Sequence, residues 1–318
     1  MRHILEGSVR HEGNRIRVAV DLIDASTDAH VWASRYDRDL TGVFAVQEEV
    51  ARQVADSLVS AVGARPTVGR VSRTEHPEAY ASYLAGRYLM DRRTREGFRG
   101  ALEQFQHAIA QDSAYAPAYA GLASAYSLWI IYSYGGIDLY EAYGRAAAMA
   151  DRAIAIDSDM AEAYAARGLT MTFASSPAEG IGVDFQRALE LRPNSPDVHI
   201  WYAVFLSRQD RHDESLAEAE RAVALDPLAP GVRTGFSMSG LAARRYDVAA
   251  REAARALALE PNLMWARAQH ALGDLLSGNA DRCAALSLGP YAGVRAMCLH
   301  SLGRVREAEH ITDSLRPR

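Results

Sequence analysis

The chain has 318 residues, of which 49% are hydrophobic and 24% are charged. This is the composition of a soluble folded protein, and the length suffices for two ordinary domains or for one domain and a repeat array. The formal net charge of −5 argues against a broad basic surface for nucleic acid. All 35 basic residues are arginine, which excludes from this chain a P-loop, a kinase strand lysine and a pyridoxal phosphate Schiff base.

The first residues alternate between apolar and polar side chains, which is typical of a half-buried strand. Turn signals at residues 12–14 and 25–28 divide this region into three segments. We therefore predict a three-stranded antiparallel meander. The apolar face of its middle strand consists of Ile16, Val18, Val20 and Leu22.

The periodicity changes to 3.6 after the predicted strands, which indicates one amphipathic helix over residues 43–58. Three strands and one helix make a small α+β domain, residues 1–62, that buries only a modest core. Residues 63–78 are rich in glycine and proline and are the predicted linker. The helix is apolar along Val43, Val46, Val50, Val54 and Leu58.

From residue 79 to residue 318 every segment has a helical pattern, and one short motif recurs. RALELRP (187–193) returns as RAVALDP (221–227) and as RALALEP (255–261), each 34 residues after the one before. Small residues stand at fixed distances before each closing proline. Small side chains let two antiparallel helices approach closely, and the proline ends the second helix, so we predict a stack of helix pairs.

This pattern resembles the tetratricopeptide repeat (TPR), which has large residues at positions 4 and 11 of each unit and alanine at positions 20 and 27. His199 and Leu206 fill the first two places in one unit, whereas Arg233 and Gly240 depart from the pattern in the next. The resemblance implies a mostly α fold, a TPR-type right-handed α-solenoid of about seven helix pairs. The predicted units are 79–115, 116–160, 161–195, 196–229, 230–263, a shortened 264–288 and 289–318.

The second unit is longer than the others, and its extra residues lie in and around residues 127–144. This segment is too apolar for a free loop, so we expect both helices of the unit to be extended. Internal packing or contact with the amino-terminal domain is favoured over an external partner site.

The amino-terminal segment resembles the latter half of the TolB amino-terminal-like domain, over residues 5–54 and through the stretches LEGSVR, LIDA and WASRYDRDL. That module precedes TPR arrays in bacterial regulators, including some adenylate cyclases, transcription regulators and membrane-bound serine/threonine kinases. The chain begins partway through the module. We therefore expect either a truncated gene product or pairing of another polypeptide with an edge strand of the incomplete sheet.

No residue pattern predicts a catalytic, cofactor or metal site. Ser237 in GFSMSG lacks the second glycine of a nucleophile elbow and lies in a helical context. Cys298 and His300 would point about 200° apart on a helix, so they cannot share a metal ion. Cys283 and Cys298 are too few for a disulfide framework, and we expect two buried apolar cysteines.

The resemblance to TPR proteins implies that the first helix of each unit lines a concave groove. The side chains expected there are mainly apolar, and a carboxylate clamp is not expected without lysine, so an apolar or helical segment fits better. Trp201, Met238 and Trp265 have core packing as their alternative role. The candidate groove residues are Asp197, Ile200, Trp201, Val204, Arg208, Thr234, Met238, Leu241, Trp265 and Leu272.

These features predict a non-catalytic scaffold or sensor module of a bacterial regulatory pathway, which binds a protein or peptide segment. The alternative is the regulatory carboxy-terminal part of a larger signalling enzyme, a receptor serine/threonine kinase or an adenylate cyclase. The chain has no apolar signal region and no run near the roughly 18 residues that span a bilayer. We expect a cytoplasmic location without direct membrane insertion, or a periplasmic one if a membrane receptor is involved.

One helix pair cannot offset the ordering of about 34 residues at about 1.5 kcal/mol each, so stability must come from stacking. We therefore expect amide hydrogens at the ends of the array to exchange first.

Overall fold

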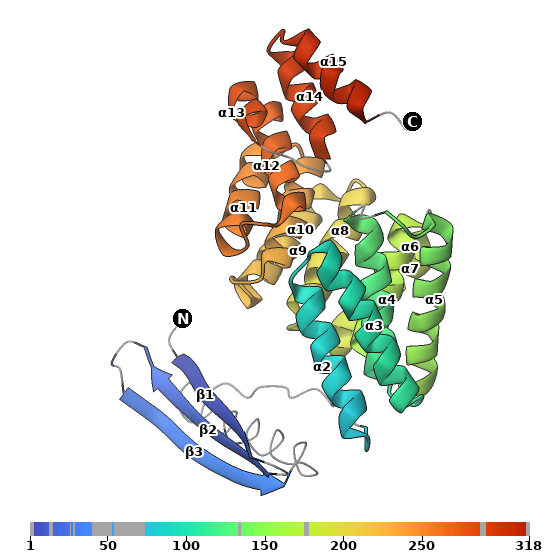
Figure 1. Cartoon of the computed structure of the whole chain (residues 1–318), viewed down its shortest axis with the longest axis vertical. Helices are drawn as coiled ribbons and strands as arrows, with labels where there is room; N and C mark the ends of the chain where they lie inside the picture. Colours follow the sequence, from blue (N-terminus) through green and yellow to red (C-terminus); the bar gives the residue numbers. More distant parts are fainter. Residues whose placement is uncertain are drawn as a thin grey trace. The chain divides into compact units, whose positions relative to one another are not determined.

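The computed structural model describes residues 3–12, 15–25, 27, 29–39, 53, 74–132, 135–174, 178–286 and 291–315. The chain divides into two compact units, residues 1–70 and residues 71–318, and each is described by itself (Figure 1). The helix predicted at 43–58 lies outside the described residues, apart from Gln53, which is helical. Most of the predicted linker also lies outside them.

The first unit contains the predicted meander. Strands β1 (His3–Glu12), β2 (Arg15–Asp24) and β3 (Ala29–Asp39) form one antiparallel sheet in the order β1-β2-β3. Leu22 lies opposite Leu5 on β1 and Trp32 on β3, and the register of β2 with β3 shifts just after Leu22. The two-residue period of the sequence is therefore kept along the middle strand.

The two faces of the sheet differ as the alternation predicts. Val20, Leu22 and Tyr36 are buried, while Arg17 on the opposite face donates to the carboxylate of Asp37 at 2.8 Å. The hydroxyl of Tyr36 donates to Oε1 of Gln53 at 2.7 Å. The apolar face of the sheet is therefore contacted by Gln53, which follows the strands in the chain.

The second unit is a row of antiparallel helix pairs, seven within the described residues, which confirms the predicted TPR-type solenoid (Figure 1). The first helix, α2, begins at Pro77, two residues before the predicted start of the array. Each predicted unit holds one pair. The helices are α2 (Pro77–Asp91), α3 (Arg95–Gln111), α4 (Ala116–Ile131), α5 (Leu139–Ile156), α6 (Ala161–Phe173), α7 (Ala178–Leu191), α8 (Pro196–Arg208), α9 (His212–Leu225), α10 (Pro230–Ala242), α11 (Tyr246–Leu259), α12 (Met264–Leu276), α13 (Ala280–Ala285), α14 (Ala292–Ser301) and α15 (Val305–Ser314).

The lengths of the pairs follow the sequence. The second pair is extended, because α4 and α5 have 16 and 18 residues whereas α8 and α9 have 13 and 14. The sixth pair is short, because α13 has only 6 residues. The second helices α9 and α11 end at Leu225 and Leu259, two residues before Pro227 and Pro261, as the recurring proline predicts.

One hydrogen bond recurs at the junctions between pairs. The residue at position 4 of a unit donates to the main-chain carbonyl six residues before it, at 2.7 to 3.2 Å. Tyrosine, histidine and arginine all make this bond, so the arginine that departs from the TPR pattern serves the same purpose as the aromatic residue. The donors are Tyr119, Tyr164, His199, Arg233 and Arg267, and the acceptors are Ser113, Ser158, Pro193, Pro227 and Pro261.

Small residues meet where the two helices of a pair cross, as predicted. In the fourth pair, Ser215 on α9 donates to the carbonyl of Ala203 on α8 at 2.8 Å. In the fifth pair the two residue types are exchanged, and Ser237 on α10 donates to the carbonyl of Ala249 on α11 at 2.9 Å. A serine hydroxyl is thus accommodated on either side of the crossing, provided that its partner is small.

The long second pair packs into the interior of the helical unit. Trp129 and Tyr132 are buried, and the indole of Trp129 donates to the carbonyl of Gly135 at 3.0 Å. Tyr140, by contrast, is 83% exposed, so the apolar residues of 127–144 do not share one role. For Trp129 and Tyr132 the internal-packing explanation holds.

Cys283 on α13 and Cys298 on α14 are bonded as a disulfide, with 5.9 Å between their Cα atoms. Both side chains are fully buried, as expected, but their pairing was not predicted. A spacing of 15 residues does not reveal that two successive helices bring the sulfur atoms together. The bond joins the last two helix pairs.

Candidate functional site

A pocket lies on the face that the first helices of successive pairs form together. Its empty volume is about 440 Å³, including the part that opens to solvent. Helices α4, α6, α8, α10 and α12 contribute its walls, and the turn between α2 and α3 contributes one arginine. The lining residues are Arg93, Leu128, Ile131, Tyr132, Leu169, Asp197, Ile200, Trp201, Val204, Gly231, Thr234, Gly235, Met238 and Trp265.

Seven of the ten candidate groove residues line this pocket, and three do not. The three others are Arg208, Leu241 and Leu272; the guanidinium of Arg208 lies instead 5.0 Å from the ring centroid of Phe173. The seven are Asp197, Ile200, Trp201, Val204, Thr234, Met238 and Trp265.

Most of these seven side chains also belong to the core. Trp201 is only 8% exposed, and Ile200, Val204 and Thr234 are buried as well. Met238 and Trp265 are half-buried, and the side chain of Asp197 is 43% exposed. Core packing and pocket lining are therefore compatible roles for Trp201, whereas Met238 offers the accessible apolar surface.

Side chains from pairs that lie earlier in the chain also line the pocket, and none of them is among the ten candidate groove residues. Leu128, Ile131 and Tyr132 reach the pocket because α4 is longer than the first helices of the other pairs, and Leu169 comes from α6. The extra residues of the second unit were the one feature of the sequence that could have indicated a role for Tyr132 in the pocket. Nothing in the sequence distinguishes Arg93 from an ordinary solvated arginine.

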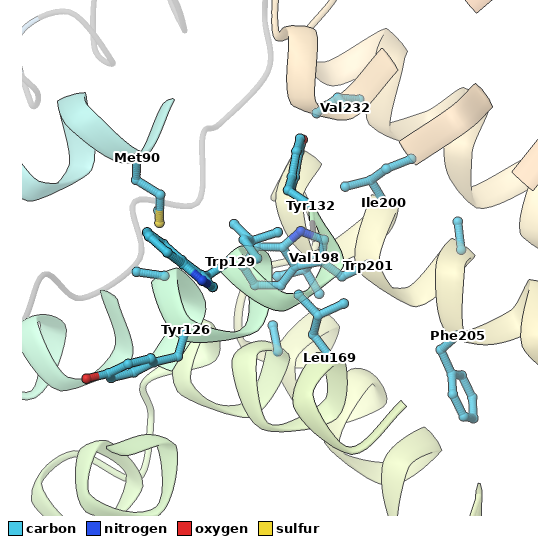
Figure 2. Packing of buried hydrophobic residues seen from close by; sticks show 14 of the residues in the cluster. Met90, Tyr126, Trp129, Tyr132, Leu169, Val198, Ile200, Trp201, Phe205 and Val232 are labelled. Atoms are coloured by element: carbon cyan, nitrogen blue, oxygen red, sulfur yellow. The ribbon is translucent and has the colours of Figure 1, made fainter. Parts of the chain in front are cut away.

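Tyr132 belongs to the same buried cluster as Ile200 on α8 and Val232 on α10 (Figure 2), and ring contacts connect it with further helix pairs. Its ring lies 5.6 Å from that of Phe98 and 6.1 Å from that of Trp265, centroid to centroid. Trp265 in turn lies 5.3 Å from Tyr291, whose hydroxyl donates to the carbonyl of Tyr132 at 2.6 Å. Tyr132 and Trp265 line the pocket, and through these rings the sixth and seventh pairs are connected to the first and second.

Arg93 supplies a buried positive charge. Its side chain is 8% exposed, and its Nη2 lies 3.9 Å from Oδ1 of Asp197. Burial by itself disfavours the charged guanidinium, but Tyr132, Asp197 and Asp91 outweigh that effect and hold the pKa of Arg93 above its ordinary value. The pocket therefore has a permanent cation at one wall and a carboxylate beside it.

Two glycines of α10 permit the close contacts around the pocket. A Cβ at Gly235 would overlap the side chain of Ile200, so the absence of one lets α10 approach α8. A Cβ at Gly231 would lie 2.9 Å from Nε and Nη2 of Arg93. Both close approaches depend on glycine, although neither residue has a positive φ.

Two hydroxyl groups at and beside the pocket bond to main-chain carbonyls of the protein itself. Thr234 donates to the carbonyl of Gly231 at 2.8 Å, and Ser237, the residue of the GFSMSG motif, is fully buried with its hydroxyl on Ala249. Within the part of the chain that the structure describes, no group of three His, Cys, Asp or Glu side chains could hold a metal ion. Across those same residues, none of the helices has both the length and the apolarity to cross a bilayer.

A search of family models gives no match to the chain. One curated protein, "Putative adenylate cyclase 3" of Rhizobium meliloti (strain 1021), is 46% identical over 85 residues. That stretch is 25% of this chain and 14% of the relative, so the chain matches only a small part of the relative's length.

Several solved TPR proteins resemble the chain in fold. TTC0263, a TPR protein of Thermus thermophilus, is 16% identical with a TM-score of 0.49, over 62% of this chain and 99% of that protein. PilW, a type IV pilus biogenesis factor, is 18% identical with a TM-score of 0.48, over 62% and 91%. YrrB, a TPR protein with an unusual peptide-binding site, is 18% identical with a TM-score of 0.34, over 60% and 88%.

Proposed function

We propose that this chain is a non-catalytic protein-interaction module of a bacterial regulatory pathway, either a scaffold or a sensor. Its pocket receives one segment of a partner protein, either a peptide or a helix. The partner is a protein because the lining is mainly apolar, with one cation and one anion, which suits side chains better than a charged polymer.

The observation that carries this proposal is the convergence of first helices on one pocket. Five helices from different pairs supply its side chains, and the aromatic residues Tyr132, Trp201 and Trp265 are among them. Aromatic anchors in partly closed pockets are where protein interfaces concentrate their binding free energy. An apolar side chain of the partner would fill the space beside Met238.

Substitution of Met238 by glutamate tests the assignment. The chain is immobilised, exposed to a lysate of the organism that encodes it, and the retained proteins are measured by quantitative mass spectrometry. Met238→Glu should reduce recovery of the specific partner at least about tenfold, because a carboxylate would be desolvated against the partner's apolar side chain. Trp201→Ala is unsuitable, since removal of a buried indole costs about 3–5 kcal/mol of stability.

Met297→Glu is the matched control. Met297 is an exposed methionine on α14 and does not line the pocket. Met297→Glu should leave recovery of the partner unchanged, although it alters the net charge of the protein by the same amount as Met238→Glu. Equal recovery by the wild type and by Met238→Glu would remove the pocket from the binding function.

A second candidate function is the regulatory carboxy-terminal part of a larger signalling enzyme, either an adenylate cyclase or a receptor serine/threonine kinase. The identity with a protein named as an adenylate cyclase favours the cyclase. The transcript that carries this chain can be sequenced upstream of the codon for Met1. An in-frame catalytic or membrane-spanning segment supports this candidate, and an in-frame stop codon directly upstream opposes it.

The amino-terminal unit is proposed to be TolB amino-terminal-like, on the basis of its sequence motifs and its three-stranded meander. An edge strand of this sheet would pair with a further strand from another polypeptide. The proposed location is the cytoplasm, or the periplasm if the chain belongs to a membrane receptor. Cell fractionation with an antibody to the chain distinguishes the two locations.

A further inference from the structure

Arg93 differs from the residues that occupy the same place in other helix pairs. The turns α2–α3, α8–α9 and α10–α11 each contain one non-glycine residue with a positive φ, between 51° and 57°. These residues are Arg93, Asp210 and Arg244. Asp210 and Arg244 are exposed to solvent, whereas Arg93 is buried and lines the pocket. The turn geometry is thus shared, and only in the first pair does it deliver a side chain to the site.

The contact of Arg93 crosses from the first pair to the fourth and fifth. It ends at Asp197, in the first turn of α8, and at Gly231, in the first turn of α10. The atoms that a Cβ at Gly231 would meet are Nε, Cζ and Nη2, which form the tip of a flexible side chain. Displacement of this tip need not disturb either helix.

Within the described helices, the first pair lies at one end of the array. Its main stacking contacts are with α4, whereas α6, α8 and α10 each have neighbours on both sides. A terminal pair with one stacking interface is held less firmly than an internal one. The contacts of Arg93 with α8 and α10 therefore add a second, more distant attachment.

We propose that the α2–α3 turn is a gate for the pocket, closed by Arg93 on Asp197 and Gly231 and opened when that contact breaks. This inference rests on the proposed binding function, because it describes how access to the same pocket is controlled. Opening exposes the apolar wall around Met238. Because the closing contact includes an ion pair whose carboxylate is partly exposed, salt favours the open form.

The gate is tested by the rate at which a cysteine in the pocket reacts with N-ethylmaleimide. The full chain carries Met238→Cys, and its native cysteines stay bonded to each other, so one thiol is reactive. Adding Asp197→Asn or Gly231→Ala should raise the labelling rate roughly threefold or more, because the first removes the charge partner and the second displaces the guanidinium. An increase in salt from about 0.05 M to about 0.5 M should raise the rate in the Met238→Cys protein and have little effect once Asp197→Asn is present.

Two control variants separate gating from local loosening. Asp213→Asn removes a carboxylate from the first turn of α9, and Gly180→Ala adds a methyl group to α7 where no atom lies within 4 Å. Both should leave the labelling rate unchanged. Unchanged labelling by Asp197→Asn and Gly231→Ala, with melting temperatures equal to that of the parent, would overturn the gate but leave the partner-capture result standing. Equal partner recovery by the wild type and by Met238→Glu, together with faster labelling by Asp197→Asn and Gly231→Ala, would overturn the binding function and leave the gate.

Discussion

In the second to sixth units, the side chain at position 4 bonds to the junction with the preceding unit. In the fifth pair this residue is Arg233, which bonds to the carbonyl of Pro227 and also pairs with Glu252 at 2.7 Å. The side chain of Glu252 is 2% exposed. Removal of the arginine would leave a turn carbonyl without its donor and a buried carboxylate with less compensation.

Arg233→Met should therefore lower the free energy of unfolding by about 2–4 kcal/mol, measured by urea denaturation. Arg255→Met is the control, because Arg255 also bonds to Glu252 but is 56% exposed, and it should cost less than about 1 kcal/mol. Arg233→His should recover part of the loss, since His199 bonds to Pro193 and Glu218 at the same spacing one unit earlier. Equal losses for Arg233→Met and Arg255→Met would contradict this role.

At the same scale, the site was only partly predictable. Met238, Trp265 and Asp197 followed from the repeat, because a fixed period assigns each residue of a first helix to a face. Arg93 did not, because its burial depends on contacts with residues more than a hundred positions later in the chain. A periodic pattern carries no information about such pairs.

At the scale of helices, pairing within a unit depends on volume rather than on residue identity. The crossings of the fourth and fifth pairs use the same two residue types in exchanged positions, Ser215 with Ala203 and Ser237 with Ala249. The pattern of small residues therefore predicted the helix pairs and their ends correctly. It could not predict which carbonyl each serine hydroxyl bonds to, since that depends on how the two helices cross.

Exchange of the residues in the fifth pair tests this interpretation. Ser237→Ala should destabilise the chain by about 0.5–1.5 kcal/mol, because it removes one buried hydrogen bond. Ala249→Ser alone adds a hydroxyl to a filled crossing, but the double variant reproduces the fourth pair and should lie within about 0.5 kcal/mol of the wild type. A double-mutant cycle by urea denaturation measures the coupling. Strictly additive losses would mean that the two crossings are not equivalent.

At the scale of the whole helical unit, contacts between distant pairs join the second pair to the last. The hydroxyl of Tyr291 donates to the carbonyl of Tyr132, and burial with nearby Tyr132 raises the pKa of Tyr291 to about 12. A raised pKa in the folded state means that this contribution to stability is fully present below the ordinary value near 10. It is then lost as the pH rises from there towards about 12.

Tyr291→Phe should lower the free energy of unfolding by about 1 kcal/mol at pH 8. The difference between the variant and the wild type should shrink at pH 11, where the phenol of the wild type begins to ionise. Chemical denaturation of both proteins at the two pH values gives this difference without interference from the other tyrosines. A difference that stays constant with pH would show that the hydroxyl of Tyr291 does not stabilise the contact between the second and seventh pairs.

The same distant contacts qualify the expected order of unfolding. Stacking alone predicts that both ends of the array exchange amide hydrogens first. Arg93 ties the first pair to α8 and α10, while the disulfide and Tyr291 tie the last pair to α13 and α4. Such contacts depend on the rise and rotation from one pair to the next, in which small shifts at each junction add up. The sequence of a repeat does not specify those shifts.

The recurring bond at the junctions bears on how such a chain can evolve. A main-chain carbonyl accepts a hydrogen bond from a phenol, an imidazole or a guanidinium alike, provided that the donor has the right reach. Substitution at position 4 of a unit can therefore change the residue type and keep the geometry of the junction. Over many generations the sequences of the units can diverge while their backbones continue to superpose. The relationship among the units is then easier to recognise from structure than from sequence.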